Sequence, residues 1–226
     1  MEHESNRSPI VLVLGTRNAK KCREMAELIA PPWECDPRLG RLLIRSVGDF
    51  EGVADVVEDA ETFAGNARKK AAETARALGT WTLADDSGLA VDALGGAPGV
   101  LSARYAGEPS DDEANNQKIL EALATVEDDR RSAAFRCALA LADPSGTIRL
   151  EAEGSCRGRI TRHRRGPGGF GYDPLFLIPE YHQTFGELSS IVKHQLSHRA
   201  RAFARLRPAL IRMIARGEME TSPTEG

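Results

Sequence analysis

The sequence predicts an α/β domain in which a mixed sheet is flanked by helices, and three patterns support this fold class. The continuous apolar run at residues 10–14 ends in Gly15 and is typical of a buried strand. A helical repeat follows it at once, which makes a strand, loop and helix unit. Two strand-like runs flank Asp-Pro-Ser-Gly at 143–146 and predict an antiparallel hairpin. At 226 residues, the chain is long enough for one large domain or for two lobes that share a sheet.

The first half of the chain predicts two capped helices between short strands. Asn18 is expected to cap a helix that ends at the proline pair 31–32. Residues 39–57 predict one further strand and a loop. Thr62 is expected to cap an alanine-rich helix that ends near Leu78, because Gly79 follows it. Residues 81–84 then predict a strand that gives way to a polar loop at Asp85.

The second half predicts a hairpin between two helices. Ser110 and the three acids after it form a capping box, which predicts a helix to about residue 126. A solvated turn at 127–131 leads to strands at 133–142 and 147–157. A short apolar run at 174–179 follows a glycine-rich loop. Ser197 is expected to open the last helix, in which Pro208 predicts a kink.

Charge, cysteines and chain ends limit the classes of partner and compartment. The net charge of −3 lacks the positive field expected of a protein that binds nucleic acid or an anionic membrane. The four cysteines include no C-x-x-C pair, which disfavours a zinc site and favours reduced thiols in the cytoplasm. Residues 1–9 and 217–226 are predicted to be flexible ends of one domain at 10–216, and no apolar run predicts a membrane span.

The adjacent acids Asp85 and Asp86 precede a run rich in glycine. Neighbouring residues of an extended strand point to opposite faces, so one aspartate is expected to serve chemistry and the other architecture. A carboxylate beside flexible backbone suits Mg²⁺, which binds through one or two carboxylates together with substrate phosphates. The alternative is an ordinary surface turn of Asp, Ser and Gly.

Two other clusters carry groups that could bind an anion or a ring. The segment at 16–21 lies between a strand end and a helix start, where backbone N–H groups and two lysines favour an anion, although solvated lysines are the plain alternative. It does not match the Walker pattern, which disfavours a P-loop enzyme. The segment at 162–173 joins basic residues to Phe170 and glycines, and it suits a stacked planar ligand or, less well, single-stranded nucleic acid.

A third cluster at 193–199 combines Lys193, His198 and Arg199. His194 and His198 lack the acid of an H-E-x-x-H motif, so a zinc pair is disfavoured. The cluster is either a basic helix start or a set of donors around a ligand rich in acceptors.

Six short motifs follow one another along most of the chain. They are Thr-x-Asn-x-x-Lys-x-x-Glu at 16–24, Glu-Thr-Phe-x-x-Asn-Ala-x-x-Lys-Ala at 61–71, Ala-Asp-Asp-Ser-Gly-Leu-x-Val-Asp-Ala-Leu-Gly-Gly-Ala-Pro-Gly-Val at 84–100, Ser-Ala-Arg-Tyr-Ala-Gly at 102–107, Phe-Gly-Tyr-Asp-Pro at 170–174, and Lys193 with Ser-His-Arg at 197–199. In this order they resemble the inosine triphosphate pyrophosphatase family, also called the dITP/XTP pyrophosphatases.

The resemblance implies a fold, an activity and a set of roles. It implies an elongated mixed sheet with two lobes around a central nucleotide cleft, in a homodimer. It implies Mg²⁺-dependent hydrolysis of ITP, dITP and XTP to the monophosphate and pyrophosphate. Asp86 matches the proton acceptor and metal-associated residue, and Glu58 lies where an acidic metal partner is expected. Substrate binding is implied for Thr16, Arg17, Asn18, Ala19, Lys20, Lys21 and Ser87 at the phosphates, and for Phe170, Gly171, Tyr172, Asp173, Lys193, His198 and Arg199 at the base.

Some positions depart from the family pattern. Gly65 stands where a glutamate often precedes Asn-Ala, which leaves open whether that helix offers a second metal-linked acid. Ala60 replaces a frequent glycine and Leu101 a usual aromatic. The run at 162–165 is not explained by the family, and it is interpreted as a charged rim of the cleft. A broader modified-nucleotide pyrophosphatase and a nucleotide-binding regulator without turnover remain as alternatives.

Overall fold

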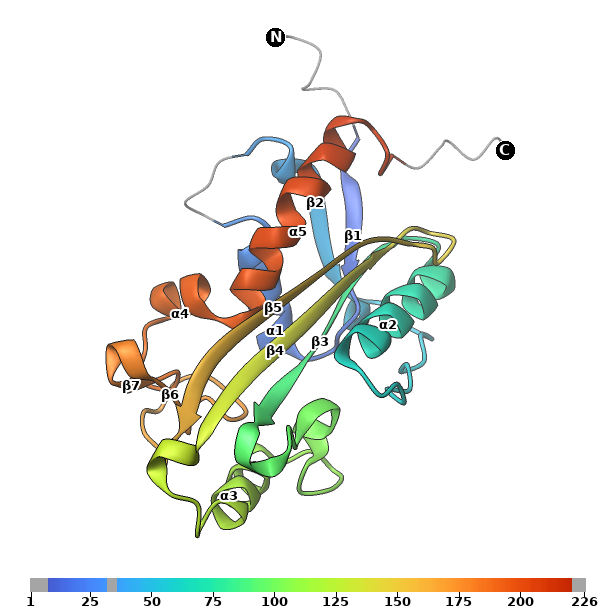
Figure 1. Ribbon diagram of the computed structural model, residues 1–226. Coiled ribbons are helices and arrows are strands. Elements are labelled where there is room, and N and C mark those ends of the chain that lie inside the picture. Colours follow the sequence, from blue (N-terminus) through green and yellow to red (C-terminus); the bar gives the residue numbers. More distant parts are fainter. Residues whose placement is uncertain (1–7, 32–35, 221–226) are drawn as a thin grey trace.

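The computed structural model describes residues 8–31 and 36–220, and it confirms the mixed α/β fold (Figure 1). One seven-stranded sheet has the order β2-β1-β3-β4-β5-β6-β7. β1 (Ile10–Leu14) pairs in parallel with β2 (Leu42–Ser46) and β3 (Trp81–Val91). The other pairs are antiparallel, and they join β3 in turn to β4 (Ser132–Ala142), β5 (Ile148–Ile160), β6 (Phe176–Ile178) and β7 (Gln183–Thr184).

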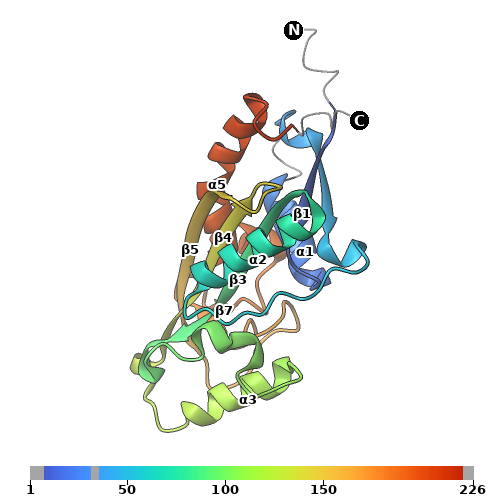
Figure 2. The ribbon, with the colours of Figure 1, turned by 90° about the vertical axis from the view of Figure 1, so that its right-hand side faces the viewer.

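Helices cover both faces of this sheet. α2 (Phe63–Leu78) packs on β3 and β4 through a layer of alanines, and these small side chains let the helix approach the strands closely. α1 (Ala19–Ile29) and α5 (His198–Ala215) share the largest core with the opposite face of the sheet. α3 (Asp112–Ala122) lies at the end of the long strands far from the chain termini (Figures 1 and 2). A second core, rich in phenylalanine, fills that end beneath α3.

The caps of the first two helices are those predicted. The Asn18 side chain accepts from the backbone N–H of Lys20 and Lys21, and the Thr62 hydroxyl accepts from that of Gly65. Gly79 ends α2 in the left-handed region with φ 61°, where glycine is tolerated without strain. Ser197 likewise caps α5, and Pro208 lies within that helix without ending it.

The third strand is longer than predicted, and this corrects the expectation of a polar loop at the paired acids. β3 continues to Val91 because β4 pairs with every residue from Thr82 onward. Gly88 lets the segment at 99–104 pack closely on this strand, since a Cβ there would lie 2.6 Å from the carbonyl oxygen of Gly99. Asp85 and Asp86 are therefore buried inside a strand, and the surface-turn alternative is wrong.

Other boundaries also differ. The cap of α3 is Asp111 rather than Ser110, whose hydroxyl donates to the carbonyl of Ala103, and the helix ends at Ala122 rather than near 126. The turn at 127–131 is not wholly solvated, because Arg131 is buried and donates to three carbonyl groups. The short helix α4 (Ser190–Leu196) was not predicted.

The outer rim of β5 is covered by arginines from α5. β6 pairs with β5 at Arg159 and Ile160, and most of that rim has no neighbouring strand among the residues that the structure describes. Arg201 donates to the carbonyl oxygen of Ser155 at 3.0 Å, and Arg205 donates to that of Glu153 at 2.7 Å. Two side chains thereby take backbone groups that a further strand would otherwise use.

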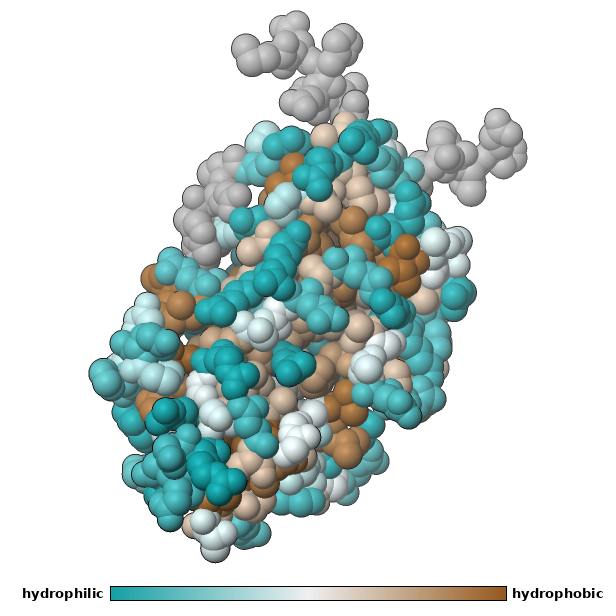
Figure 3. Space-filling view, viewed as in Figure 1, coloured by the Kyte–Doolittle hydropathy of each residue, from teal (hydrophilic) through white to brown (hydrophobic). Residues whose placement is uncertain are grey.

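The C-terminal residues that follow α5 return to the main core at Met219. Residues 1–7 and 221–226, which belong to the predicted flexible ends, lie outside the described residues, as does Cys35. Residues 217–220 are described, and Met219 among them is buried in the main core. Within 8–31 and 36–220, no helix is long and apolar enough to cross a membrane. Figure 3 shows hydrophilic side chains spread among hydrophobic ones over one face of the molecule.

Candidate active site

The two adjacent aspartates of β3 face opposite sides of the sheet, as predicted. Asp86 faces α2, where its Oδ2 accepts from Nδ2 of Asn66 at 3.0 Å. Asp85 faces α1 and α5, where its Oδ2 lies 3.2 Å from Nε of Arg199 and 3.7 Å from Nζ of Lys21. The strand thus places one carboxylate in each of two charged clusters.

The cluster around Asp86 has two acids and one buried lysine. Nζ of Lys70 lies 2.7 Å from Oε1 of Glu58 and 3.6 Å from Oδ1 of Asp86. Burial raises the pKa of Asp86 and the Glu58 carboxylate adds to this, although Lys70 opposes it. Burial alone would lower the pKa of Lys70, but Asp85, Asp86 and Glu58 raise it, so the lysine keeps its charge. Asp86 is therefore a carboxylate whose ionised form needs a nearby cation.

The cluster around Asp85 is a buried ion network. Burial alone would raise the pKa of Asp85, but Lys21, Arg199 and Lys70 outweigh it and hold that pKa well below its usual range. Arg199 also donates to Glu24 at 3.0 Å and to the hydroxyl of Ser87 at 2.7 Å. A guanidinium has five N–H groups, so these bonds leave Arg199 with donors for a ligand. Asp85 is thus paired with cations of the protein itself.

A hollow of about 250 Å³, here called the Lys70 hollow, lies beside the first cluster. Its lining includes Gly15, Thr16, Arg17, Lys21, Asp55, Glu58, Lys70 and Thr74. Nε of Arg17 lies 2.6 Å from Oδ1 of Asp55. Three cations and the turn before α1 therefore face a space that also holds the Glu58 carboxylate, which suits an anion that brings a metal ion with it.

A second hollow of about 130 Å³, here called the Phe170 hollow, opens between β3, α5 and two loops. Its lining includes Asn18, Lys21, Ser87, Ser102, Ala103, Asp112, Phe170, Gly171, Tyr172, Asp173, His198 and Arg199. Lys193 lies behind it, 2.7 Å from Asp173 and 5.0 Å from the centre of the Phe170 ring. An aromatic face with buried polar groups at its edge suits a planar heterocycle.

His198 enters the Phe170 hollow as a neutral ring. It is buried and stacks on Phe135 with centroids 4.8 Å apart. Burial, followed by the charges of Arg199 and Lys193, lowers its pKa well below 6.5. Its Nδ1 has no partner among the described residues. A neutral imidazole offers one donor and one acceptor to a ligand.

Most of the predicted site residues come together in the two hollows. Lys21 lines both, so the hollows adjoin at this side chain. Asp86 lies between Asn66 and Lys70 behind the Lys70 hollow. Ala19 and Lys20 are exposed and line neither hollow.

Sequence reasoning assigned no role to three buried residues of the site. They are Glu24, Asn66 and Lys70, of which the last two lie four residues apart on the face of α2 that meets β3. A lysine among alanines on the buried face of a helix was the available signal, because such a charge needs a partner.

The arginine run at 162–165 is paired rather than free. Arg162 contacts Asp128 at 2.7 Å, Arg164 contacts Glu113, and Arg165 contacts Glu187 at 3.1 Å. These pairs tie the loop to its neighbours, and the pair with Glu113 joins it to α3. The run therefore anchors the loop that carries Phe170.

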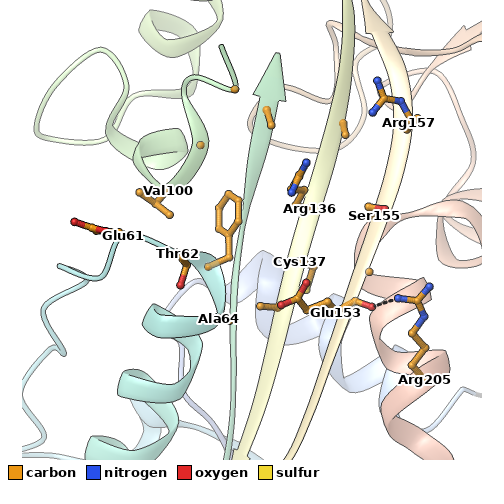
Figure 4. Close-up of a pocket in the computed structure, with 17 residues that line it drawn as sticks. Glu61, Thr62, Ala64, Val100, Arg136, Cys137, Glu153, Ser155, Arg157 and Arg205 are labelled. Atoms are coloured by element: carbon orange, nitrogen blue, oxygen red, sulfur yellow. Dashed lines mark hydrogen bonds between the residues drawn. The ribbon is translucent and has the colours of Figure 1, made fainter. Parts of the chain in front are cut away.

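A larger hollow of about 730 Å³ lies elsewhere, on the part of the sheet that α2 leaves uncovered (Figure 4). Here called the sheet-face hollow, it is lined by Glu61, Phe63, Val100, Arg136, Glu153, Ser155, Arg157 and Arg205, among others. It includes none of the predicted catalytic or substrate-binding residues. Its size alone does not make it the reactive centre.

Known proteins of similar sequence and fold match nearly the whole chain. Residues 12–209 match the Ham1 family. A protein of Rhodopirellula baltica named dITP/XTP pyrophosphatase is 55% identical over 203 residues, which are 90% of this chain and 94% of that one. One of the same name from Desulforamulus reducens is 51% identical over 92% of this chain and 99% of its own. A solved HAM1 protein structure from Coxiella burnetii superimposes with a TM-score of 0.78 at 38% identity, over 90% of this chain and 99% of that one. The chain belongs to the Ham1 family.

Proposed function

We infer that this chain is a dITP/XTP pyrophosphatase that acts in the cytoplasm. It hydrolyses ITP, dITP and XTP to the nucleoside monophosphate and pyrophosphate, and so removes deaminated purines from the nucleotide pool. The activity resides in a single domain at residues 10–216. The two relatives of that name, at 55% and 51% identity over nearly the whole chain, support the activity. The observation that carries the assignment of substrate is the pair of adjoining hollows, one cationic and one aromatic, that meet at Lys21.

The two hollows divide the substrate between them. The triphosphate lies in the Lys70 hollow, where Arg17, Lys21 and Lys70 offset its charge and the turn before α1 offers backbone N–H groups. The base lies in the Phe170 hollow against the aromatic ring. Asp86, beside Lys70, orients or deprotonates the attacking water.

Mg²⁺ is the cofactor in this proposal, and the donor set fits it. The described residues contain no group of three or more His, Cys, Asp or Glu side chains that could hold a metal. Two carboxylates, Asp86 and Glu58, face the same lysine, and Mg²⁺ completes such a set with phosphate oxygens and water. When bound, the ion neutralises charge on the phosphate oxygens. Because residue 65 is glycine, α2 offers no acid at that position. A Cβ at residue 65 would lie 2.7 Å from the Cβ of Ala60.

Product analysis tests this proposal. With Mg²⁺, the chain should release pyrophosphate and IMP from ITP, because the cations grip the distal phosphates and leave the α-phosphorus open to water. Release should be lost in EDTA. Initial release of orthophosphate with IDP would contradict the proposal. Binding of ITP without turnover would favour a regulator, and equal activity on other modified bases would favour a broader pyrophosphatase.

We further infer a homodimer that forms across the sheet-face hollow. After Arg149, the side chains of β5 on that face are, in order, Glu151, Glu153, Ser155, Arg157 and Arg159, so over these five residues the charge reverses about Ser155. A twofold axis brings the same patch of two copies together and requires such self-complementarity. In Figure 4, Glu153, Ser155 and Arg157 follow one another along β5 beside the hollow.

Charge exchange tests this surface by sedimentation equilibrium. Glu153→Arg should give monomers, because it faces Arg157 of the second copy with a like charge. Adding Arg157→Glu in the same chain should restore the dimer. If the Glu153→Arg variant still forms dimers, the interface lies elsewhere.

A further inference from the structure

Two adjacent asparagines on α3 are buried, and each bonds to backbone groups outside the helix. Asn115 and Asn116 are 2% and 1% exposed, respectively. Asparagine competes with the backbone for hydrogen bonds and is a modest helix former, so burying two in the middle of a short helix needs another reason. Each side chain bonds to a different wall of the Phe170 hollow.

Asn115 holds the wall formed by residues 102–106. Its Oδ1 accepts from the backbone N–H of Ala106 at 2.7 Å, and its Nδ2 donates to the carbonyl of Ala103 at 3.0 Å. Ala103 and its neighbour Ser102 line the hollow. One side chain therefore holds this short segment at two points relative to α3.

Asn116 holds the opposite wall at Gly171. Its Nδ2 donates to the carbonyls of Gly171 at 2.9 Å and of Asp112 at 2.8 Å. The Asp112 carboxylate in turn accepts from the N–H of Gly171 at 2.8 Å. Both backbone groups of Gly171, which has φ 59°, are thus held by α3, directly beside the stacking ring of Phe170.

We propose that Asn115 and Asn116 are positioning residues that hold the two walls of the Phe170 hollow at a fixed separation, and so set the discrimination between 6-oxo and 6-amino purines. The inference rests on the proposed function, in which this hollow takes the base. A 6-oxo purine presents an acceptor at O6 and a donor at N1, and adenine reverses both. Fixed donors and acceptors reject the reversed pattern because they are left unpaired, whereas loose walls can move to accept it.

The test is Asn116→Asp, which keeps the volume and removes the two donors toward carbonyl oxygens. We expect KM for ITP to rise by roughly tenfold and the ratio of kcat/KM for ITP over ATP to fall by about tenfold, with kcat for ITP within about threefold of wild type. The matched control is Gln117→Glu, the same change of amide to acid on the next residue. Its side chain is exposed and bonds to Glu121 of its own helix. This control should leave both KM and the ratio unchanged.

A second variant and a second measurement separate positioning from mere stability. Asn116→Ser retains one donor and should give an intermediate ratio if Asn116→Asp does not fold. Calorimetric titration with IMP and AMP reports base preference without turnover, and the preference for IMP should narrow in both variants. A lowered Tm with an unchanged preference overturns the proposal. Failure of the wild type to release pyrophosphate from ITP would sink the proposed function, whereas the titration would still decide the role of Asn116.

Discussion

Replacing Asp86 with asparagine is expected to lower kcat for ITP by roughly a thousandfold and to leave the fold intact. The amide loses the charge that a hard cation needs and cannot accept a proton. The fold should tolerate the change, because burial raises the pKa of Asp86 above its ordinary 3.8. A carboxyl whose pKa is raised on folding stabilises the protein only when protonated, and that stability is lost as the pH rises through the folded value. At pH 7 the neutral amide therefore removes the free-energy cost of burying an ionised carboxylate at this position.

Two measurements decide this prediction. Pyrophosphate release gives kcat, and urea unfolding at pH 7 in EDTA gives stability without a metal contribution. The urea midpoint of Asp86→Asn should equal or exceed that of the wild type. A variant that keeps more than about a tenth of wild-type kcat, a barrier change under ~1.4 kcal/mol, would remove Asp86 from the reaction. A large loss of stability would make it a structural residue.

The same change at the neighbouring residue should have the opposite outcome. Asp85→Asn is expected to cost about 3–5 kcal/mol of unfolding free energy, because it leaves the buried Arg199 and the partly buried Lys21 without their shared carboxylate. The pKa of Asp85 lies below its ordinary 3.8, so its stabilisation is present above that value and is lost as the pH falls through the folded value. The difference in unfolding free energy between the wild type and Asp85→Asn should accordingly narrow below pH 3.8.

Urea unfolding again provides the measurement. Asp92→Asn is the control, since Asp92 pairs with Arg157 at the surface, with side chains 47% and 66% exposed. Such pairs contribute ~0–1 kcal/mol. If Asp85→Asn cost no more than this control, the network around Arg199 would not be needed for the fold.

The sequence predicted the elements whose signals are local. Asn18, Thr62 and Ser197 cap helices as expected, because a cap is a hydrogen bond between residues two or three apart. The opposite orientation of Asp85 and Asp86 was also predictable, since it follows from strand geometry alone. The motifs led to the family and its fold.

What could not be predicted depends on contacts between distant segments. β3 runs through its polar residues because β4 pairs along its whole length, and the residues themselves favour a turn. Lys70 meets Asp86 because an alanine layer brings α2 close to the sheet. The donors of Arg199 face Asp85 and Glu24, from two other parts of the chain, so its surroundings are not visible in the motif at 197–199.

The arginines of α5 along β5 also limit how copies of this protein can meet. An unpaired strand rim is a template on which another chain can add a strand, and such additions can continue without end. Arg201 and Arg205 already bind two carbonyl oxygens of that rim and set positive charge against an approaching backbone. Association by backbone pairing is thereby disfavoured, whereas the sheet-face hollow on the same strands stays accessible to the side chains of a second copy. The proposed dimer would therefore be a closed pair, and this rim resists growth into open-ended fibres.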